Sequence, residues 1–141
     1  MKIRIKYFDN AKKIEKIPQG DWIDLTANAD MDLEQGGHYF IPLGVAMELP
    51  NGYEAHVAPR SSSFKHWGFL VTNSFGIIDS SYCGDNDQWF LSVYATRNTH
   101  ISKGDRICQF RVVEKQPQID FEEVDILGNS DRGGCGSTGV N

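Results

Sequence analysis

The sequence has 141 residues, of which 40 % are apolar and 23 % charged, and its formal net charge is −5. A chain of this length forms one ordinary domain and can bury a core without cross-links. The negative net charge argues against a broad basic surface for nucleic acid or for an anionic membrane, because both depend on clustered lysine and arginine. A small phosphorylated ligand is still compatible with it, since such a ligand needs only a few local donors.

The cysteines and the N-terminus both indicate a reducing, intracellular setting. Cys83, Cys108 and Cys135 lie far apart and show neither CxxC spacing nor the framework of a secreted disulfide protein. The first residues alternate Ile3 and Ile5 with basic residues and lack the apolar stretch of a signal peptide. No segment approaches the ~20 apolar residues of a membrane helix. The sequence therefore predicts a cytoplasmic protein with reduced thiols and with neither a membrane nor a nucleic-acid partner.

Short segments with alternating apolar residues predict β-strands from the N-terminus onward, at residues 3–7, 45–49 and 108–112. Residues typical of turns separate such segments, at positions 36–37, 51–52, 84–86 and 103–105. No long window carries a helical apolar stripe, and only residues 62–67 are expected to form a short helical turn. We predict an all-β jelly roll or distorted barrel of about ten short strands.

The composition changes at Gly128, where the last segment of the chain becomes rich in glycine and almost free of apolar residues. We expect a barrel domain over residues 1–127 and a flexible arm over residues 128–141. An end of this composition is often disordered. Its backbone N–H groups, the guanidinium of Arg132 and the hydroxyls of Ser137 and Thr138 could also wrap a phosphate chain.

Two internal segments carry residues suited to ligand binding. The hydroxyls that follow Arg60 could bind an anion, although a serine cluster is more often an ordinary polar loop. Residues 73–84 place Asp79 and Tyr82 three apart between glycines. A hairpin of this kind could stack a flat ring on Tyr82 and hold the carboxylate nearby. In the alternative interpretation, Asp79 caps a turn and Tyr82 is a half-buried barrel residue.

Five segments, taken in order, resemble the five motifs of the trimeric dUTPase family. They are residues 24–27 (DLTA), 59–62 (PRSS), 73–84 (NSFGIIDSSYCG), 104–109 (GDRICQ) and 132–139 (RGGCGSTG). The resemblance implies a jelly-roll subunit and a homotrimer whose active sites are built from all three chains. It also implies hydrolysis of dUTP to dUMP and pyrophosphate, which keeps uracil out of DNA and supplies dUMP for thymidylate synthesis. The length suits both bacterial and bacteriophage members.

The resemblance assigns roles to individual residues. Asp79 is the implied general base that activates the attacking water, and Asp24 is expected to hold Mg²⁺ through coordinated water. Tyr82 packs against the deoxyribose, and Arg60 and Arg106 either touch phosphate or orient a neighbouring carboxylate. The substrate-binding residues implied by the motifs are Arg60, Ser61, Ser62, Asn73, Gly76, Ile78, Tyr82, Gln109, Arg132, Gly136, Ser137 and Thr138.

One departure from the family concerns the ring that stacks on uracil. The fifth motif usually carries an aromatic residue, but here the position is Cys135. A thiol offers no stacking face. Trp89 and Phe90, just after the third motif, could supply the missing ring, and we favour Phe90. The alternative is that both are core residues of the barrel.

A second departure is the third serine after Arg60, because this motif also resembles that of the dCTP deaminases, which share the fold. Those enzymes need a glutamate on the strand after the third motif, and residues 88–98 contain no acid. A deaminase is therefore the alternative function. A third interpretation is a catalytically inactive binding module of the same fold. The presence of Asp24, Asp79 and Arg132 argues against it. The sequence indicates no regulatory protein partner.

Overall fold

The computed structural model describes residues 1–134 and 136, and within them it contains eleven strands and one short helix. The all-β prediction is confirmed, with one strand more than expected. In chain order the elements are β1 (Arg4–Tyr7), β2 (Ile23–Thr26), β3 (Met31–Leu33), β4 (His38–Pro42), β5 (Val45–Glu48), β6 (Tyr53–Pro59), α1 (Ser63–Trp67), β7 (Phe69–Val71), β8 (Gly76–Ile78), β9 (Phe90–Ala95), β10 (Thr99–Ile101) and β11 (Arg106–Glu114).

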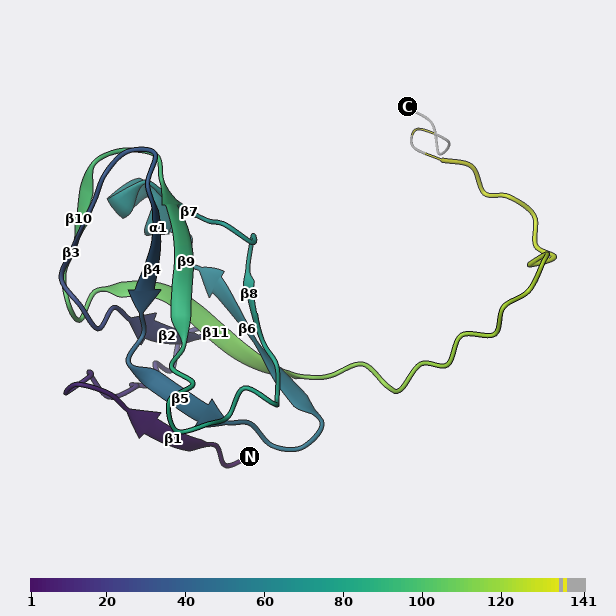
Figure 1. Ribbon diagram of the computed structural model, residues 1–141, viewed down its shortest axis with the longest axis horizontal. Coiled ribbons are helices and arrows are strands. Elements are labelled where there is room, and N and C mark those ends of the chain that lie inside the picture. Colours follow the sequence, from purple (N-terminus) through teal and green to yellow (C-terminus); the bar gives the residue numbers. More distant parts are fainter. Residues whose placement is uncertain (135, 137–141) are drawn as a thin grey trace.

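The strands form two larger antiparallel sheets and two short ribbons. One sheet has the order β2-β11-β6-β8 and the other β4-β9-β7. The ribbons are β1-β5 and β10-β3. Figure 1 shows β11 running across the body of the molecule and leading directly into the C-terminal segment. The two sheets therefore enclose a single core between segments that are far apart in the sequence.

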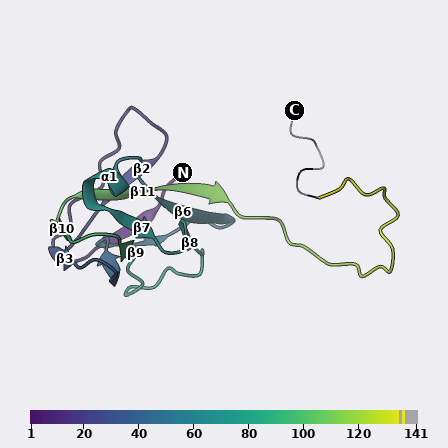
Figure 2. The same cartoon turned by 90° about the horizontal axis from the view of Figure 1, so that it is seen from above.

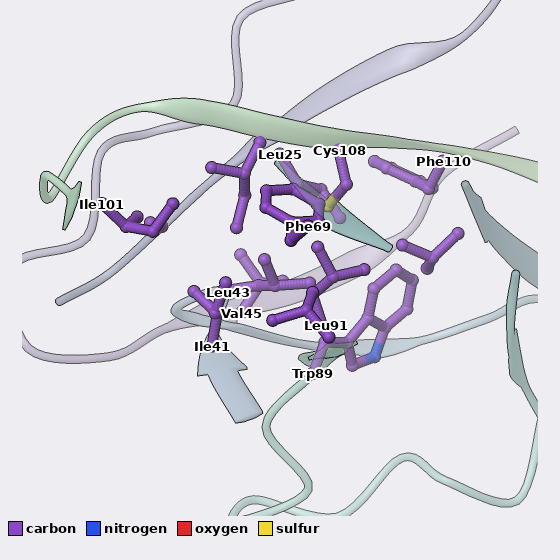
Figure 3. Packing of buried hydrophobic residues seen from close by; sticks show 14 of the residues in the cluster. Leu25, Ile41, Leu43, Val45, Phe69, Trp89, Leu91, Ile101, Cys108 and Phe110 are labelled. Carbon is purple, nitrogen blue, oxygen red and sulfur yellow. The ribbon is translucent and has the colours of Figure 1, made fainter. Parts of the chain in front are cut away.

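The predicted alternation holds in β11, whereas β5 buries three consecutive residues and Ile5 of β1 is exposed. In β11, Cys108 and Phe110 are buried, whereas Gln109 between them is only partly buried. Trp89 is 0 % exposed, and its ring meets that of Phe110 edge-on at 5.5 Å (Figure 3). A slip of one residue in register would turn every buried side chain of a strand outward. The core thus fixes which polar side chains face the outer surface.

The predicted turns and the short helix occur where the sequence places them. Gly52, between β5 and β6, and Gly104, between β10 and β11, have φ angles of +87° and +93°. Only glycine adopts these angles at little cost. Helix α1 lies within the predicted segment and ends at Gly68, whose φ of +66° closes it. No helix among the described residues is long and apolar enough to cross a membrane.

The C-terminal segment leaves the body of the molecule after β11. Between residue 115 and the end of the described chain there is neither helix nor strand, and Figures 1 and 2 show the segment extending away from the sheets. It exposes several large apolar side chains, among them Phe121 at 93 % and Leu127 at 83 %. The domain boundary at residue 127 stays a prediction, and Cys135, Ser137 and Thr138 lie outside the described residues.

Candidate active site

A polar row crosses the outer face of the first sheet. In β11, Gln109 pairs with Asp24 of β2 on one side and with Ala58 of β6 on the other. The neighbouring pair of Leu25 and Cys108 is buried in the core. Because side chains alternate along a strand, this burial points the Asp24 carboxylate and the Gln109 amide outward together.

Two arginines hold the Asp24 carboxylate. Arg60 Nε lies 3.3 Å from Oδ1, and Arg106 Nη1 lies 3.5 Å from Oδ2. Arg60 also donates from Nη1 to the carbonyl oxygen of Arg106 at 3.0 Å, which ties the two segments together. Of the two roles expected for these arginines, orienting a neighbouring carboxylate is the one visible in the geometry. Cys108 lies buried beneath the cluster. Its burial is the main cause that raises the pKa of the thiol, and the charge of Asp24 raises it further, so this cysteine stays protonated.

The serines after Arg60 have different environments. Ser61 lines a cavity of about 330 Å³ together with Asp24, Arg106 and Gln109. Ser63 is fully buried, where its hydroxyl donates to the Ile107 carbonyl and accepts from the Arg60 N–H, both at 2.9 Å. Ser62 precedes α1 without using its side chain as a cap. The cavity therefore combines guanidinium, hydroxyl and amide donors of the kind that bind phosphate, and the third serine is structural.

The third motif is not a hairpin, so that prediction was wrong. Among its residues only β8 is a strand, and β8 pairs with β6 of the first sheet, whereas the next strand, β9, belongs to the second sheet. The pairing of Ile78 with Ala55 fixes Asp79 at the end of β8. Asn73 lies exposed before β8 and Gly76 pairs with Val57, so neither lines the cavity described below.

The loop after β8 is held by its own hydrogen bonds. Tyr82 N–H donates to the Asp79 carbonyl at 3.0 Å, and the Tyr82 hydroxyl donates to the Gln88 carbonyl at 2.8 Å. Gly84 N–H donates to the Asp87 carboxylate at 2.8 Å. These contacts set Tyr82 beside Asp79 without any helix or paired strand.

Asp79 is exposed but has a defined charge and orientation. Its Oδ1 accepts hydrogen bonds from the backbone N–H of Ser81 at 2.9 Å and from the Ser81 hydroxyl at 3.0 Å. The pKa of the Asp79 carboxyl lies below its ordinary value. The main cause is the backbone hydrogen bond from Ser81, followed by the hydrogen bond from the Ser81 hydroxyl, and the positive charge of Lys115 lowers the pKa further. Within residues 1–134 and 136, Oδ2 has no hydrogen-bond partner. The result is an ionised carboxylate with one oxygen available to a water molecule.

Ser81 was not identified from the sequence as a site residue. The signal was present, because an aspartate followed two residues later by serine is typical of a turn in which the carboxylate accepts the N–H of the second residue. The sequence allows two roles for Asp79, a catalytic base or a turn cap. In the structure Asp79 closes the turn through Oδ1 and leaves Oδ2 free, so the two interpretations are compatible.

An apolar cavity of about 410 Å³ opens beside Asp79. Its lining includes Ser81 and Tyr82 from the loop, and Phe40 and Phe90 from the second sheet. Phe90 is 46 % exposed, whereas the adjacent Trp89 is packed in the core (Figure 3). Both residues border the cavity, but burial separates the two aromatic candidates: the Trp89 side chain belongs to the core, whereas the Phe90 ring is exposed and open to a ligand.

The two cavities share no lining residue. Ile78, the residue before Asp79, pairs with Ala55, whereas Gln109 pairs with Ala58. Three residue steps along β6 separate these rows by about 10 Å. A single chain therefore carries the free carboxylate and the phosphate-type donors in separate places. Arg132 and Gly136 are exposed on the C-terminal segment, outside both linings.

Comparison with known proteins shows which family the chain belongs to. Residues 10–139 match the family model described as dUTPase. The chain belongs to the dUTPase family. The SPbeta prophage-derived deoxyuridine 5'-triphosphate nucleotidohydrolase YosS of Bacillus subtilis is 59 % identical over 141 residues, covering 99 % of both chains. The deoxyuridine 5'-triphosphate nucleotidohydrolase of Helicobacter hepaticus is 37 % identical over 144 residues, covering 99 % of this chain and 90 % of that protein. The resemblance seen in the five motifs is therefore confirmed.

Solved structures extend the likeness to the fold. A Staphylococcus bacteriophage 80alpha dUTPase variant with dUpNHpp superposes with a TM-score of 0.81 at 21 % identity, covering 99 % of each chain. A dUTPase variant from phage phi11 of S. aureus, which coordinates a structural Mg(II) ion, gives a TM-score of 0.78 at 16 % identity, with 90 % of this chain and 99 % of that chain covered. These matches confirm the jelly-roll fold of the dUTPase subunit.

Proposed function

We propose that this protein hydrolyses dUTP to dUMP and pyrophosphate, with Asp79 as the general base. The observation that carries the proposal is the Asp79 carboxylate, which is fixed through Oδ1 by Ser81 and open at Oδ2 beside an apolar cavity. Attack of water on a charged triphosphate needs a base within one hydrogen bond of that water. The lowered pKa keeps this carboxylate ionised, so it is ready to orient the water and accept its proton.

The apolar cavity is the proposed site for the uracil base and the deoxyribose. Tyr82 lies at its edge with its hydroxyl fixed to the Gln88 carbonyl, a position from which the ring packs against the sugar and excludes a 2′-hydroxyl. Phe90 supplies the stacking ring that Cys135 lacks. Its exposure in the cavity wall supports this role, because the face of an apolar ring gains most from covering a flat base.

The phosphate chain is proposed to bind in the cavity of Ser61 and Gln109, with Ser62 alongside. From the C-terminal segment, Arg132, Gly136, Ser137 and Thr138 would close over the terminal phosphate. The arrangement separates the base from the phosphates, in keeping with the apolar lining around Phe90 and the charged lining around Asp24.

The residues around Asp24 fit a hydrated Mg²⁺ better than a metal bound directly by protein ligands. Both carboxylate oxygens already face a guanidinium, and the described residues contain no cluster of three or more His, Cys, Asp or Glu that could enclose a metal. Mg²⁺ dehydrates reluctantly and binds mainly to phosphates, so Asp24 would hold it through coordinated water. When bound, the metal would neutralise charge and fix the geometry of the triphosphate.

We propose a homotrimer with shared sites, and the separation of the two cavities supports it. Because one chain does not bring Asp79 to the donors around Asp24, the complete site is proposed to combine the Asp79 loop of one subunit with the phosphate cavity of a second. The extended C-terminal segment of a third would then cover it. Its exposed apolar side chains support this assembly, because contact with another subunit would cover Phe121 and Leu127.

Incubation of the purified protein with each deoxynucleoside triphosphate and Mg²⁺, followed by identification of the products, tests the proposal. We expect dUMP and pyrophosphate from dUTP alone and no ammonia from dCTP. Release of ammonia from dCTP while dUTP stays intact would instead support the deaminase. No turnover of any nucleotide, with dUTP still bound, would support the inactive binding module.

Replacing Ser81 by alanine should change the pH dependence of the reaction. The base works only when ionised, so activity is lost as the pH falls through the pKa of Asp79. Since that pKa is lowered, kcat/KM of the parent should persist below the pH at which an ordinary aspartate takes up its proton. Removing the hydroxyl removes one of the two hydrogen bonds to Oδ1, so the fall should begin at a higher pH. The backbone hydrogen bond remains, which limits the shift.

The measurement is the pH profile of kcat/KM for Ser81→Ala beside that of Ser80→Ala. The neighbouring Ser80 forms no hydrogen bond with Asp79 in the described structure and serves as the control. An acid limb that is identical in the two variants would show that the Ser81 hydroxyl does not tune the base.

A further inference from the structure

Phe40 has an unusual position for a large apolar side chain. It is 61 % exposed, yet it lines the cavity that also contains Asp79 and Phe90. None of the five motifs includes Phe40, because it lies between the first motif, residues 24–27, and the second, residues 59–62. It reaches the cavity only through the pairing of β4 with β9.

The register of this pairing makes the two phenylalanines diagonal neighbours on one face of the sheet. Phe40 pairs with Ser92, and Pro42 pairs with Phe90. The intervening Ile41 is buried, so Phe40 and Phe90 project from the same outer face as diagonal neighbours. Diagonal positions on paired strands are within reach of aromatic side chains.

A polar chain supports the Phe40 ring from the opposite side. The His38 ring lies edge-on to it, with 4.7 Å between centroids. His38 Nε2 is 2.7 Å from Ser92 Oγ, and Ser92 Oγ is 2.7 Å from Thr72 Oγ1. These contacts link β4 and β9 to Thr72, the residue after β7, and they fix the His38 ring against Phe40.

We propose that Phe40 is a positioning residue that holds the Phe90 ring over the base. The inference rests on the proposed function, because it assigns Phe90 to the uracil site. A half-exposed phenylalanine has free rotamers, and ordering it on binding costs conformational entropy. A fixed neighbouring ring removes some of these rotamers beforehand. Phe40 therefore strengthens binding of the base and leaves the chemical step at the phosphates unchanged.

The test combines Phe40→Ala, Phe90→Ala and the double variant. Phe40→Ala should raise KM for dUTP and weaken calorimetric binding of dUMP by roughly 2- to 10-fold, the range of an aromatic pair, with kcat unchanged. In the Phe90→Ala background the same substitution should have no further effect, because the ring it positions is absent. Phe40→Tyr keeps the ring and should restore the parent KM and dUMP affinity.

Leu70→Ala is the matched control. Leu70 is 51 % exposed and pairs with Tyr94 in the same sheet, but it does not line the cavity. The Leu70→Ala substitution should leave KM for dUTP unchanged. Phe40→Ala with parent affinity for dUMP would overturn the inference, as would an equal loss in the presence and absence of Phe90. A parent that binds dUMP but does not hydrolyse dUTP would refute the proposed function alone, since the dUMP measurement needs no turnover.

Discussion

Replacing Asp79 by asparagine is expected to lower kcat for dUTP by about 100- to 10,000-fold, the usual contribution of a general base. The change is nearly isosteric, and an amide oxygen can still accept the two hydrogen bonds from Ser81, so the loop should keep its shape. Oδ2 is the oxygen proposed to take the proton. In asparagine an amide nitrogen, which cannot accept a proton, takes its place. Turnover should therefore fail while the protein still folds and binds substrate.

Steady-state kinetics, with binding of a non-hydrolysable dUTP analogue measured in parallel, checks this prediction. Asp85→Asn is the control, because Asp85 is an exposed acid in the same loop that does not line the Asp79 cavity. A variant that hydrolyses dUTP within a few-fold of the parent would remove Asp79 from the role of base. Loss of turnover in both variants would point to damage of the loop instead.

A chain ending at Leu127 should lose most of its turnover, with less change in ground-state binding and in thermal stability. The removed residues include Arg132 and the hydroxyls proposed to close over the terminal phosphate. Such closure orders the phosphate and excludes water, which matters more in the transition state than in the resting enzyme. Removing a segment that is almost free of apolar residues costs little packing. If Phe90 stacks on the base, selectivity for uracil should outlast the truncation, whereas Phe90→Ala should weaken it.

Two further variants separate catalysis from assembly in this experiment. Arg132→Ala in the full-length chain should reproduce much of the loss in turnover, since it removes the charged phosphate donor alone. A chain ending at Glu114 also lacks the apolar side chains of residues 115–127 and should trimerise more weakly in sedimentation experiments. Full activity of the chain ending at Leu127 would refute the closing segment. Loss of its trimer would show that residues 128–141 are structural.

The sequence predicted much of the local structure correctly, because the relevant signals lie within a few residues of each other. Alternation in β11 predicted that Cys108 and Phe110 are buried, and glycines predicted turns near Gly52 and Gly104. These signals depend on steric limits of the backbone and on the period of a strand. The third motif shows their limit, because turn residues around β8 suggested a hairpin, whereas β8 pairs with β6 from earlier in the chain.

The sequence by itself determined the family and the fold class, since five ordered motifs and period-two strands need no knowledge of distant contacts. Only the tertiary structure decided which side chains meet. It joined Asp24 to Arg60 and Arg106 from three separate segments, turned Trp89 into the core, and placed Phe40 beside Phe90. The physical reason is that strand register is set by burial of the whole core. The partners of an outward-facing residue therefore depend on strands far away in the sequence.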